Sequence, residues 1–525
     1  MCTLLVVLPL DSFGRTFHEK QPYKLLPAPQ QIVYETGIFQ FGKQIKVSFP
    51  ETLSTETKQL EAGLKAQGYR FKKSSATKCD VKLVLDKNLS SGKKNGYVLT
   101  VRPDQICIVG IDKTGVFYGI QTLLQLMRFN LQEGQLRCGT VTDYPAYSWR
   151  AFMLDEARHF KGKKVVCSLL DRMAEMKMNI FHWHLTDHQG WRIEIKQYPK
   201  LTEVGAYRDS SMLGHWKSNK YDGKPHSGFY TQKEIKEIIR YAQDRHITIL
   251  PEIDMPGHSS AAIAAYPEIG SSGKAIKVPC KFGPQYEVYD VTRPEVVRFL
   301  KNVLTEVIAL FPSPIIHIGG DEVRFNQWNE SATIQQYMKD HHIQSPAELQ
   351  LQFTNELSTW IEQQGRRMMG WNEITGEKLH EYHTADTTKV SGTLAKNSIV
   401  HFWKGEPKLI TKAIKNGHDI VNSYHIFTYL DYSYKQIPLQ KAYDFQPTPA
   451  GLTKQEQQHV LGLGCQMWGE FIPTVKDMNR QVFPRIAAYA EVGWTDPSKK
   501  DFTRFTQSLE KLSEYWEQFG IQWNK

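Results

Sequence analysis

The sequence Ile315-Ile316-His317-Ile318-Gly319-Gly320-Asp321-Glu322-Val323-Arg324 joins an apolar, β-branched run to two glycines and two consecutive carboxylates. Such a run predicts a buried strand, because parallel strands covered on both faces are almost continuously apolar. Barrel enzymes carry their reacting groups where such strands end, so we expect Asp321 and Glu322 to lie in a pocket. The alternative is a strand followed by a simple turn, in which the glycines supply the bend and Glu322 is solvated.

Strand patterns of the same kind recur from residue 147 onward and alternate with helical patterns. The expected strands are residues 149–156, 179–185, 248–254, 315–322, 367–373, 399–403, 419–425 and 461–470. The expected helices are residues 164–176, 231–245, 294–310, 346–364, 408–416 and 480–492. This alternation predicts an α/β fold, a (β/α)8 barrel of the TIM type. A doubly wound open sheet is the alternative, although no strand is followed by the Gly-x-Gly-x-x-Gly pattern of dinucleotide-binding sheets.

The chain around this barrel divides into three segments. Residues 22–145 predict a smaller α+β accessory domain without a catalytic cluster, and the barrel itself is expected over residues 146–495. Residues 496–525 predict a helical segment packed on the barrel. Residues 1–21 predict a tail, whose short apolar stretch leaves open whether it is the remnant of an export signal. In the accessory domain the expected strands are residues 31–34, 45–49, 81–85, 97–101 and 106–111, and the expected helix is residues 115–129.

Composition limits the classes of partner. The net charge of the 525 residues is +10, from 65 Lys and Arg against 55 Asp and Glu. No basic block is long enough to follow a phosphate backbone, so we expect no nucleic-acid partner. No apolar run reaches the length of a membrane span. The seven cysteines are scattered and odd in number, which predicts neither a metal knuckle nor a disulfide framework.

The ends of the expected strands supply carboxylates, tryptophans and arginines. They include Arg150, Asp155, Asp187, Arg192, Glu252, Asp254, His258, Asp321, Glu322, Trp371, Glu373, Trp403, Tyr429, Asp431, Trp468 and Glu470. Aromatic faces pack against the apolar faces of a sugar ring, and carboxylates and arginine bind its hydroxyls, so this mixture indicates a carbohydrate site. Core packing is the better explanation for any single tryptophan, but Trp371, Trp403 and Trp468 end three different strands.

A competing interpretation is a metal-dependent hydrolase. His182 and His184 are two residues apart on an expected strand, so their side chains point the same way and can bind one metal ion. His258, His317 and Asp187 are expected nearby. Alternatively, the two histidines are satisfied by hydrogen bonds inside the barrel, and activity that survives chelation would remove the metal interpretation.

Six motifs, in order along the chain, resemble the family 20 glycoside hydrolases, the β-N-acetylhexosaminidases. They are Trp149-Arg150-Ala151-Phe152-Met153-Leu154-Asp155, His184-Leu185-Thr186-Asp187-His188-Gln189-Gly190-Trp191-Arg192, Pro251-Glu252-Ile253-Asp254-Met255-Pro256-Gly257-His258-Ser259, residues 317–323, Tyr429-Leu430-Asp431-Tyr432 and Trp468-Gly469-Glu470. The resemblance runs from residue 22 to residue 495 and includes an accessory domain. The chain departs from the family pattern at Ala151, where Gly is common, and at His188, where a second Asp is usual.

The resemblance implies a retaining exo-β-N-acetylhexosaminidase that uses its substrate's own 2-acetamido oxygen as the nucleophile, through an oxazolinium ion. The spacing agrees, because two adjacent acids can hardly flank the anomeric carbon from both faces, and two acids so close tend to raise one of the two pKa values. By resemblance Glu322 is the general acid and base, Asp321 holds the acetamide N–H, and Tyr429 holds its carbonyl oxygen. The implied substrate-binding residues are Arg150, Asp187, His258, Trp371, Trp403, Asp431, Trp468 and Glu470.

The same resemblance implies glycans ending in β-linked N-acetylglucosamine or N-acetylgalactosamine as substrates, with no metal and no cofactor. Family members are often exported, so we expect a periplasmic or extracellular location, which the N-terminus supports only weakly. A carbohydrate-binding protein that has lost catalysis is the further alternative, against which the intact set of Asp321, Glu322 and Tyr429 argues.

Overall fold

The structure, a computed structural model, describes residues 22–75, 78–89, 92–384 and 386–524, and the expected tail of residues 1–21 lies outside them. The chain divides into two compact units. Of the described residues, the first contains those up to Ala146 together with Trp494–Tyr515, and the second contains Tyr147–Gly493 together with those from Trp516 onward. No helix in the described ranges combines the length and the apolar character needed to cross a membrane.

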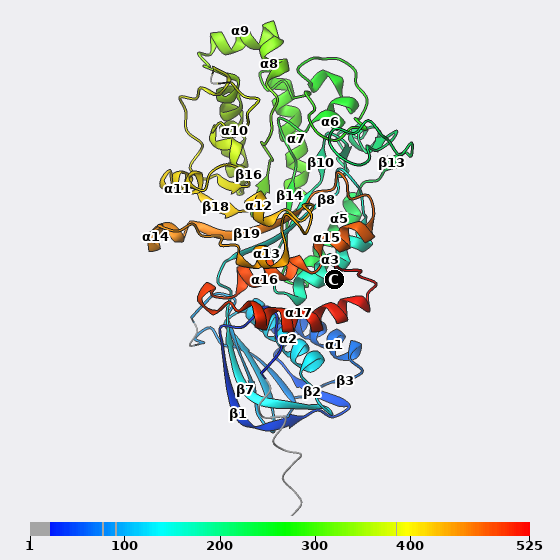
Figure 1. Ribbon diagram of the computed structural model, residues 1–525, viewed down its shortest axis with the longest axis vertical. Coiled ribbons are helices and arrows are strands. Elements are labelled where there is room, and N and C mark those ends of the chain that lie inside the picture. Colours follow the sequence, from blue (N-terminus) through cyan, green and yellow to red (C-terminus); the bar gives the residue numbers. More distant parts are fainter. Residues whose placement is uncertain (1–21, 76–77, 90–91, 385, 525) are drawn as a thin grey trace, which may run out of the picture. The chain divides into compact units, whose positions relative to one another are not determined.

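The first unit is built on one seven-stranded sheet with the strand order β1-β7-β5-β6-β4-β2-β3. Its strands are β1 (Gln31–Gln40), β2 (Gln44–Ser48), β3 (Arg70–Lys73), β4 (Val81–Leu85), β5 (Tyr97–Val101), β6 (Ile106–Gly110) and β7 (Gln135–Asp143). Helices α1 (Ser54–Ala66) and α2 (Lys113–Phe129) pack on one face of this sheet (Figure 1). Helix α2 begins after Asp112, whose side chain accepts a hydrogen bond from the backbone N–H of Gly115. The mixed α+β architecture expected from the sequence is confirmed.

Helix α17 (Phe502–Glu517) is the helix within the C-terminal segment expected over residues 496–525. Residues up to Tyr515 belong to the first unit, where the guanidinium of Arg128 lies 3.6 Å from the centre of the Tyr515 ring and Arg504 donates a hydrogen bond of 2.8 Å to the carbonyl of Leu25. Trp516 and the residues after it belong to the second unit. An amphipathic helix shows in its sequence which face is apolar, but not which surface that face will cover.

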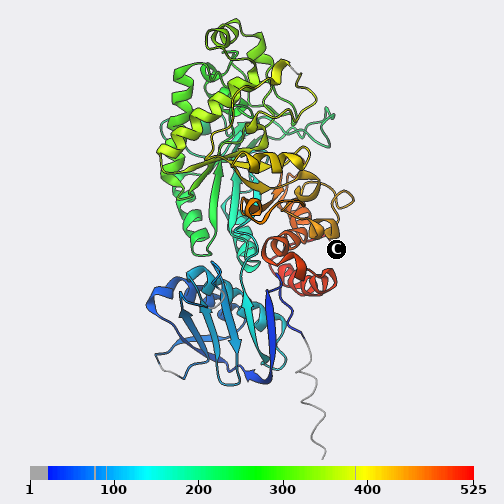
Figure 2. The same cartoon turned by 90° about the vertical axis from the view of Figure 1, so that its left-hand side faces the viewer.

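The second unit is a closed barrel of eight parallel strands, as predicted (Figure 2). Around the barrel the order is β14 (Thr248–Glu252), β15 (Ile315–His317), β16 (Arg367–Trp371), β17 (Ile399–Phe402), β18 (Asp419–Asn422), β19 (Val460–Met467), β8 (Trp149–Asp155) and β9 (Ile180–His184). One interior layer is apolar, and its buried residues are Trp149, Ala151, Ile180, Leu250, Met369, Ile399 and Val421. The larger outer helices are α3 (Lys163–Glu175), α5 (Gln232–Gln243), α7 (Pro294–Leu310), α10 (Pro346–Gln363), α11 (Lys408–Lys415), α15 (Val475–Val482) and α16 (Arg485–Trp494).

The expected helix over residues 480–492 is wrong in its start. Helix α15 ends at Val482, and α16 begins at Arg485, directly after Pro484. Proline has no N–H to donate within a helix and its ring collides with the preceding turn, so one continuous helix cannot pass through this position.

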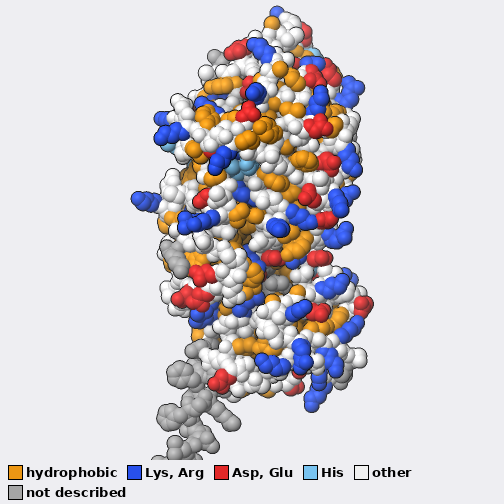
Figure 3. Space-filling model, turned by 90° about the vertical axis from the view of Figure 1, so that its right-hand side faces the viewer, with side chains coloured by type: hydrophobic (Ala, Val, Ile, Leu, Met, Phe, Trp, Pro, Cys, Tyr) orange, Lys and Arg blue, Asp and Glu red, His pale blue; other side chains and the backbone are white. Residues whose placement is uncertain are grey.

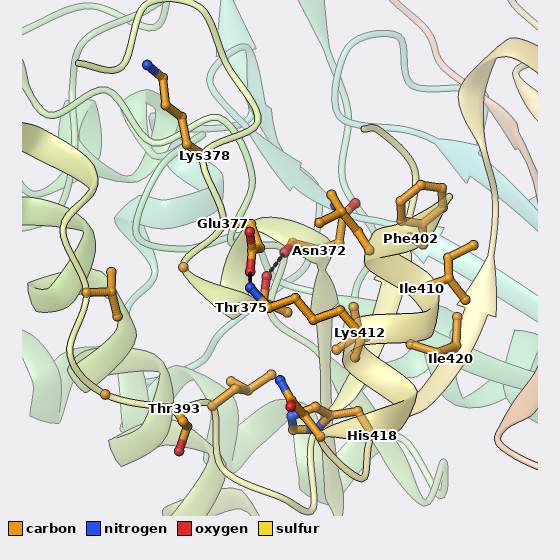
Figure 4. A pocket seen from close by; sticks show the side chains of 18 of the residues that line it. Asn372, Thr375, Glu377, Lys378, Thr393, Phe402, Ile410, Lys412, His418 and Ile420 are labelled. Carbon is orange, nitrogen blue, oxygen red and sulfur yellow. Dashed lines mark hydrogen bonds and ion pairs between the residues drawn. The ribbon is translucent and has the colours of Figure 1, made fainter. Parts of the chain in front are cut away.

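A cavity of about 400 Å³ lies outside the barrel wall, where the described residues between β16 and β17 form the short 3-10 turns η3 (Asn372–Thr375) and η4 (Asp386–Thr388) but no α-helix. Figure 4 shows Phe402, Ile410 and Ile420, from β17, α11 and β18, at its wall. The acid among its lining residues, Glu377, is paired with Lys412. This cavity therefore lacks the carboxylate pair from which a reaction site was expected.

Basic side chains are scattered over the molecular face in Figure 3, among acidic and apolar ones. The net positive charge thus forms no continuous stripe on that face.

Candidate active site

The chain turns sharply after β15, at Gly319 and Gly320, whose φ angles are +67° and +91°. A Cβ atom at Gly319 would overlap the Asp254 carboxylate, so only glycine fits there. The N–H of Gly320 donates to Asp254 Oδ1 at 3.1 Å, and Gln350 donates to the carbonyl of Gly320 at 2.7 Å. The turn brings the next residues, Asp321 and Glu322, into a pocket at the end of the strand.

Glu322 itself has a φ angle of +49°, in the left-handed region that residues with side chains rarely adopt. A backbone held in this region costs on the order of 1–3 kcal/mol and persists where the surroundings dictate it, often at functional sites. His258, on the other side of the pocket, has a φ angle of +48°. Two of the acid–base groups around the pocket are thus held by strained backbone.

The pocket has a volume of about 210 Å³. Its lining residues are Arg158, Trp216, His258, Asp321, Glu322, Trp403, Tyr429, Asp431, Tyr432, Trp468 and Glu470. Residues predicted from the sequence make up eight of them, and the structure adds Arg158, Trp216 and Tyr432.

Aromatic rings form one side of the pocket. The rings of Trp403 and Tyr429 are nearly parallel, with 6.0 Å between their centres and an angle of 7° between their planes. Trp468 lies 6.0 Å from Tyr429 and 5.9 Å from Trp371. Burial raises the pKa of Tyr429 well above its usual value, so its hydroxyl stays protonated and can donate a hydrogen bond.

Trp371 lies beneath these rings and does not line the pocket. Only 1% of it is exposed, and its indole N–H donates to Glu252 Oε1 at 2.8 Å. Trp371 therefore supports Trp468 from below. Trp403 does reach the pocket, and its indole N–H donates to Glu373 Oε2 at 2.9 Å, which fixes the orientation of the ring.

Arg158 lies among carboxylates on another side of the pocket. Its guanidinium is 2.7 Å from Asp187 Oδ2, 3.2 Å from Asp155 Oδ2 and 3.8 Å from Glu470 Oε1. Burial, and then the neighbouring Glu470, raise the pKa of Asp431 well above its usual value. Asp431 Oδ1 is buried and has no hydrogen-bond partner among the described residues, so a ligand hydroxyl can satisfy it.

His258 connects Asp321 to this network. Its Nε2 is 3.5 Å from Asp321 Oδ2, and its Nδ1 is 3.0 Å from Asp187 Oδ1. Although burial opposes a positive charge, Asp187 and Asp321 raise the pKa of His258 to about 9. His258 is therefore a cation at neutral pH. Asp187 does not line the pocket but holds His258 and Arg158 from behind.

The pKa of Asp321 is raised by its surroundings. Burial and the nearby carboxylates of Glu373 and Glu252 raise the pKa of Asp321 to about 7, against the opposing effect of His258. Its Oδ1 is buried without a hydrogen-bond partner among the described residues. Asp321 thus presents an unused acceptor atom in the region where an N–H group of a ligand could bind.

The prediction that Arg150 binds substrate is wrong. Arg150 is the second residue of β8, at the opposite end of the strand from the pocket, and it is fully buried. Its side chain donates hydrogen bonds to the carbonyls of Lys177 at 2.8 Å and Tyr147 at 2.7 Å. Arg158, three residues beyond the end of the same strand, is the arginine that reaches the pocket.

The positions of His182 and His184 do not support a shared metal ion that a substrate could reach. His184 has Nδ1 at 2.7 Å from Glu252 Oε2 and Nε2 at 2.9 Å from Asp187 Oδ2, so both of its ring nitrogens already face carboxylates. His182 groups instead with Glu252 and His317, with ligand atoms within 4.8 Å of one another. At most 1% of each of these three residues is exposed, so an ion held there would lie out of a substrate's reach.

Comparison with known proteins decides the family. Residues 147–497 match the catalytic domain of glycosyl hydrolase family 20, and residues 22–144 match domain 2 of the same family. The chain belongs to glycosyl hydrolase family 20. It is therefore a glycoside hydrolase by family, and the pocket at residues 321 and 322 lies within the part of the chain that matches the family's catalytic domain.

Relatives and solved structures agree with this assignment. A β-hexosaminidase of Porphyromonas gingivalis is 35% identical over 82% of this chain, and the chain spans 55% of that protein's length. A family 20 exo-β-N-acetylglucosaminidase of Vibrio harveyi, solved in complex with N-acetylglucosamine, has a TM-score of 0.81 at 29% identity and covers 96% of this chain and 78% of its own. The β-N-acetylhexosaminidase of Bacteroides fragilis has a TM-score of 0.79 at 28% identity, over 95% and 96% of the two chains.

The chain departs from the family pattern at Ala151 and His188, and both residues are buried. Ala151 is 2% exposed in the apolar layer of the barrel, where its extra methyl group is simply packed. His188 has Nδ1 at 2.8 Å from Ser260 Oγ, and its ring centre is 4.8 Å from that of His258. Burial, and then the His258 cation, hold the pKa of His188 well below its usual value. A neutral ring thus occupies the position at which the family resemblance led us to expect a second Asp.

Three residues that line the pocket, Arg158, Trp216 and Tyr432, were not predicted from the sequence. Arg158 follows the first barrel strand closely enough to have been found by its position. Tyr432 lies within the motif at residues 429–432, although only Tyr429 and Asp431 were given roles. Trp216 comes from a long connecting segment between β12 (Tyr207–Arg208) and β13 (His226–Ser227), and no local pattern indicates that this segment reaches the pocket.

Proposed function

We propose that this family 20 hydrolase is a retaining exo-β-N-acetylhexosaminidase, which removes terminal β-linked N-acetylglucosamine or N-acetylgalactosamine by substrate-assisted catalysis. The observation that carries the proposal is the pocket itself, in which Asp321 and Glu322 face a box formed by Trp403, Tyr429 and Trp468. Its volume of about 210 Å³ suits one terminal sugar rather than an internal stretch of glycan. The bound N-acetylglucosamine named for the Vibrio harveyi structure is consistent with this choice.

The substrate's acetamido oxygen is the best nucleophile in this proposal. Asp321 and Glu322 are consecutive residues, whereas two-carboxylate glycosidases hold their acids on opposite sides of the bond, about 5 to 10 Å apart. The other pocket acids, Asp431 and Glu470, have raised pKa values because they are buried. Burial thus disfavours the charged carboxylate form of both groups, which is the nucleophilic one, and this favours the amide oxygen of the sugar.

Glu322 acts as acid and then as base. In the first step Glu322 gives its proton to the glycosidic oxygen as the bond to C1 breaks, and the acetamido oxygen bonds to C1 to form an oxazolinium ion. In the second step the Glu322 carboxylate takes a proton from water, whose oxygen bonds to C1 as the bond from C1 to the acetamido oxygen breaks, which restores the acetamide and releases the sugar. Two inversions at C1 retain its configuration.

The remaining groups position the sugar. Asp321 accepts the acetamide N–H and stabilises the positive charge that develops on nitrogen, and Tyr429 donates its hydroxyl to the acetamide oxygen. Arg158, Asp431 and Glu470 bind ring hydroxyls. Trp403 and Trp468 enclose the acetamide and the sugar faces, with Trp371 beneath them.

Two variants test these roles. We expect Asp321→Asn to lower kcat by about a hundredfold or more, because the amide then lacks its anionic acceptor. Glu322→Gln should lose most activity on glycans but keep far more on a dinitrophenyl N-acetylglucosaminide, whose leaving group needs little protonation. Steady-state kinetics on both substrates measure this.

Full activity of both variants on an aryl N-acetylglucosaminide would show that the assignment is wrong. The absence of turnover by the wild-type protein on every such substrate, combined with sugar binding, would favour the carbohydrate-binding alternative. Thermal unfolding of each variant controls for misfolding.

A further inference from the structure

Trp216 differs from the rest of the pocket in its exposure. Half of this residue, 50%, is exposed, whereas Asp321, Tyr429 and Trp468 are at most 9% exposed. Every other lining residue is buried or only partly exposed. Trp216 therefore faces both the pocket and the solvent, and it lies at the opening rather than at the base.

Trp216 is held in place by two neighbouring segments. Its ring meets Phe471 edge to face at 5.2 Å, and Phe471 meets Phe282 at 5.5 Å. Gly283, with a φ angle of +93°, lets its own backbone approach the indole so closely that a Cβ atom there would lie 3.1 Å from it. The indole is thus fixed by packing and does not depend on a ligand for its position.

The segment that carries Trp216 is itself closed by hydrogen bonds. The N–H of Leu213 donates to the carbonyl of Lys220 at 2.8 Å, and the N–H of Asp222 donates to the carbonyl of Ser211 at 3.0 Å. The N–H of Met212 donates to the carbonyl of Cys280 at 2.9 Å, which ties the segment to the chain beside Phe282. Several other aromatic side chains are as exposed, but Trp216 also lines the pocket, so its free face is available to a ligand at the opening.

We infer that Trp216 is a specificity-determining residue that binds the sugar ring on the leaving-group side of the scissile bond. This inference rests on the proposed function, because it assumes that the terminal sugar occupies the buried part of the pocket. The next ring of the glycan would then emerge at the opening, where the indole offers a flat apolar face to the C–H face of a pyranose. The favoured substrates are accordingly β-linked oligosaccharides, in which a second sugar follows the terminal one.

The test compares a disaccharide with a monosaccharide in the Trp216→Ala variant. The disaccharide N,N′-diacetylchitobiose occupies both positions, and N-acetylglucosamine, measured as a competitive inhibitor, occupies only the inner one. We expect KM for the disaccharide to rise about tenfold and kcat to change less than about twofold, because a stacking contact that is equal in ground and transition states affects binding alone. The inhibition constant of N-acetylglucosamine should stay the same, and Trp216→Phe should keep part of the affinity.

Tyr221→Ala is the matched control. Tyr221 lies on the same segment and is 43% exposed, but it does not line the pocket, so its removal should leave KM for the disaccharide unchanged. An unchanged KM in Trp216→Ala would overturn the inference. So would a parallel rise in the inhibition constant of N-acetylglucosamine, since Trp216 would then contact the terminal sugar. If the wild-type protein hydrolysed neither the disaccharide nor an aryl N-acetylglucosaminide, this would contradict the proposed function. The inference, which rests on that function, would then be overturned as well.

Discussion

The neighbouring His258 cation favours the ionised form of Asp321. His258 has its Nε2 3.5 Å from Asp321 Oδ2 and a pKa raised to about 9, so it stabilises the Asp321 carboxylate at neutral pH. Burial nevertheless raises the pKa of Asp321 to about 7 in the unliganded protein. Because only the ionised carboxylate can stabilise the positive charge that develops on the acetamide nitrogen, kcat/KM should fall below about pH 7, by about tenfold per pH unit.

His258→Gln tests this relation. Removing the cation destabilises the Asp321 carboxylate, so the pKa of Asp321 rises and the acidic limb of kcat/KM moves to higher pH. The pH dependence of kcat/KM for wild type and variant measures the shift. His188→Gln is the control, because the pKa of His188 lies well below its usual value and the substitution exchanges one neutral group for another. An acidic limb that stays in place, or moves to lower pH, in His258→Gln would contradict the account.

At the scale of elements, the turn after β15 decides where the acids lie. Gly319 combines a φ angle of +67° with a position against the Asp254 carboxylate. The apolar run before the turn was enough to predict the strand, and the two glycines were enough to predict a bend. The close approach to Asp254 depends on a neighbouring strand and could not be predicted from the run itself.

Gly319→Ala should lower kcat by about a hundredfold, because the new methyl group displaces Asp254 and with it the turn that carries Asp321 and Glu322. Gly273→Ala is a matched control, since Gly273 has a similar φ angle of +62° but open space around its Cβ position. In that control the free energy of unfolding should fall by about 1–2 kcal/mol because of backbone strain, and kcat should be retained. Equal effects of both substitutions on kcat would contradict the role of the close contact.

The mistaken choice of Arg150 also belongs to this scale. A strand rises about 3.3 Å per residue, so Arg150 lies about 16 Å from the far end of β8, at Asp155. An apolar pattern identifies the strand but does not show which of its two ends lies at the pocket. The parallel direction of the barrel strands, which brings their C-terminal ends together, selects Arg158 instead.

For the whole molecule, apolar periodicity was sufficient to predict all eight barrel strands and the α+β character of the N-terminal unit. The residues that line the pocket came largely from strand ends, which parallel pairing brings together. Trp216 was missed, because the residues with which it lines the pocket lie far away in the sequence. Such contacts depend on the assembled fold rather than on a local pattern.

Leu512→Ala tests the place of α17 in the molecule. Leu512 is 1% exposed and lies in the part of α17 that belongs to the first unit. Its truncation should lower the free energy of unfolding by about 2–5 kcal/mol, measured by denaturant titration. Glu510→Ala, at an exposed position of the same helix, should change it by less than about 0.5 kcal/mol. A Leu512→Ala variant as stable as the wild type would show that the helix is not an integral part of the fold.

The sharpest test of substrate-assisted catalysis concerns the sugar itself. Turnover of an aryl β-glycoside that carries the 2-acetamido group should be compared with turnover of its 2-hydroxy analogue, under the same conditions and with the same leaving group. An internal nucleophile held against C1 accelerates its reaction by many orders of magnitude, so we predict a kcat/KM ratio of about a thousandfold or more in favour of the acetamido substrate. Comparable turnover of the two glycosides would contradict the account, because the nucleophile that attacks C1 would then come from the protein and not from the acetamido group of the substrate.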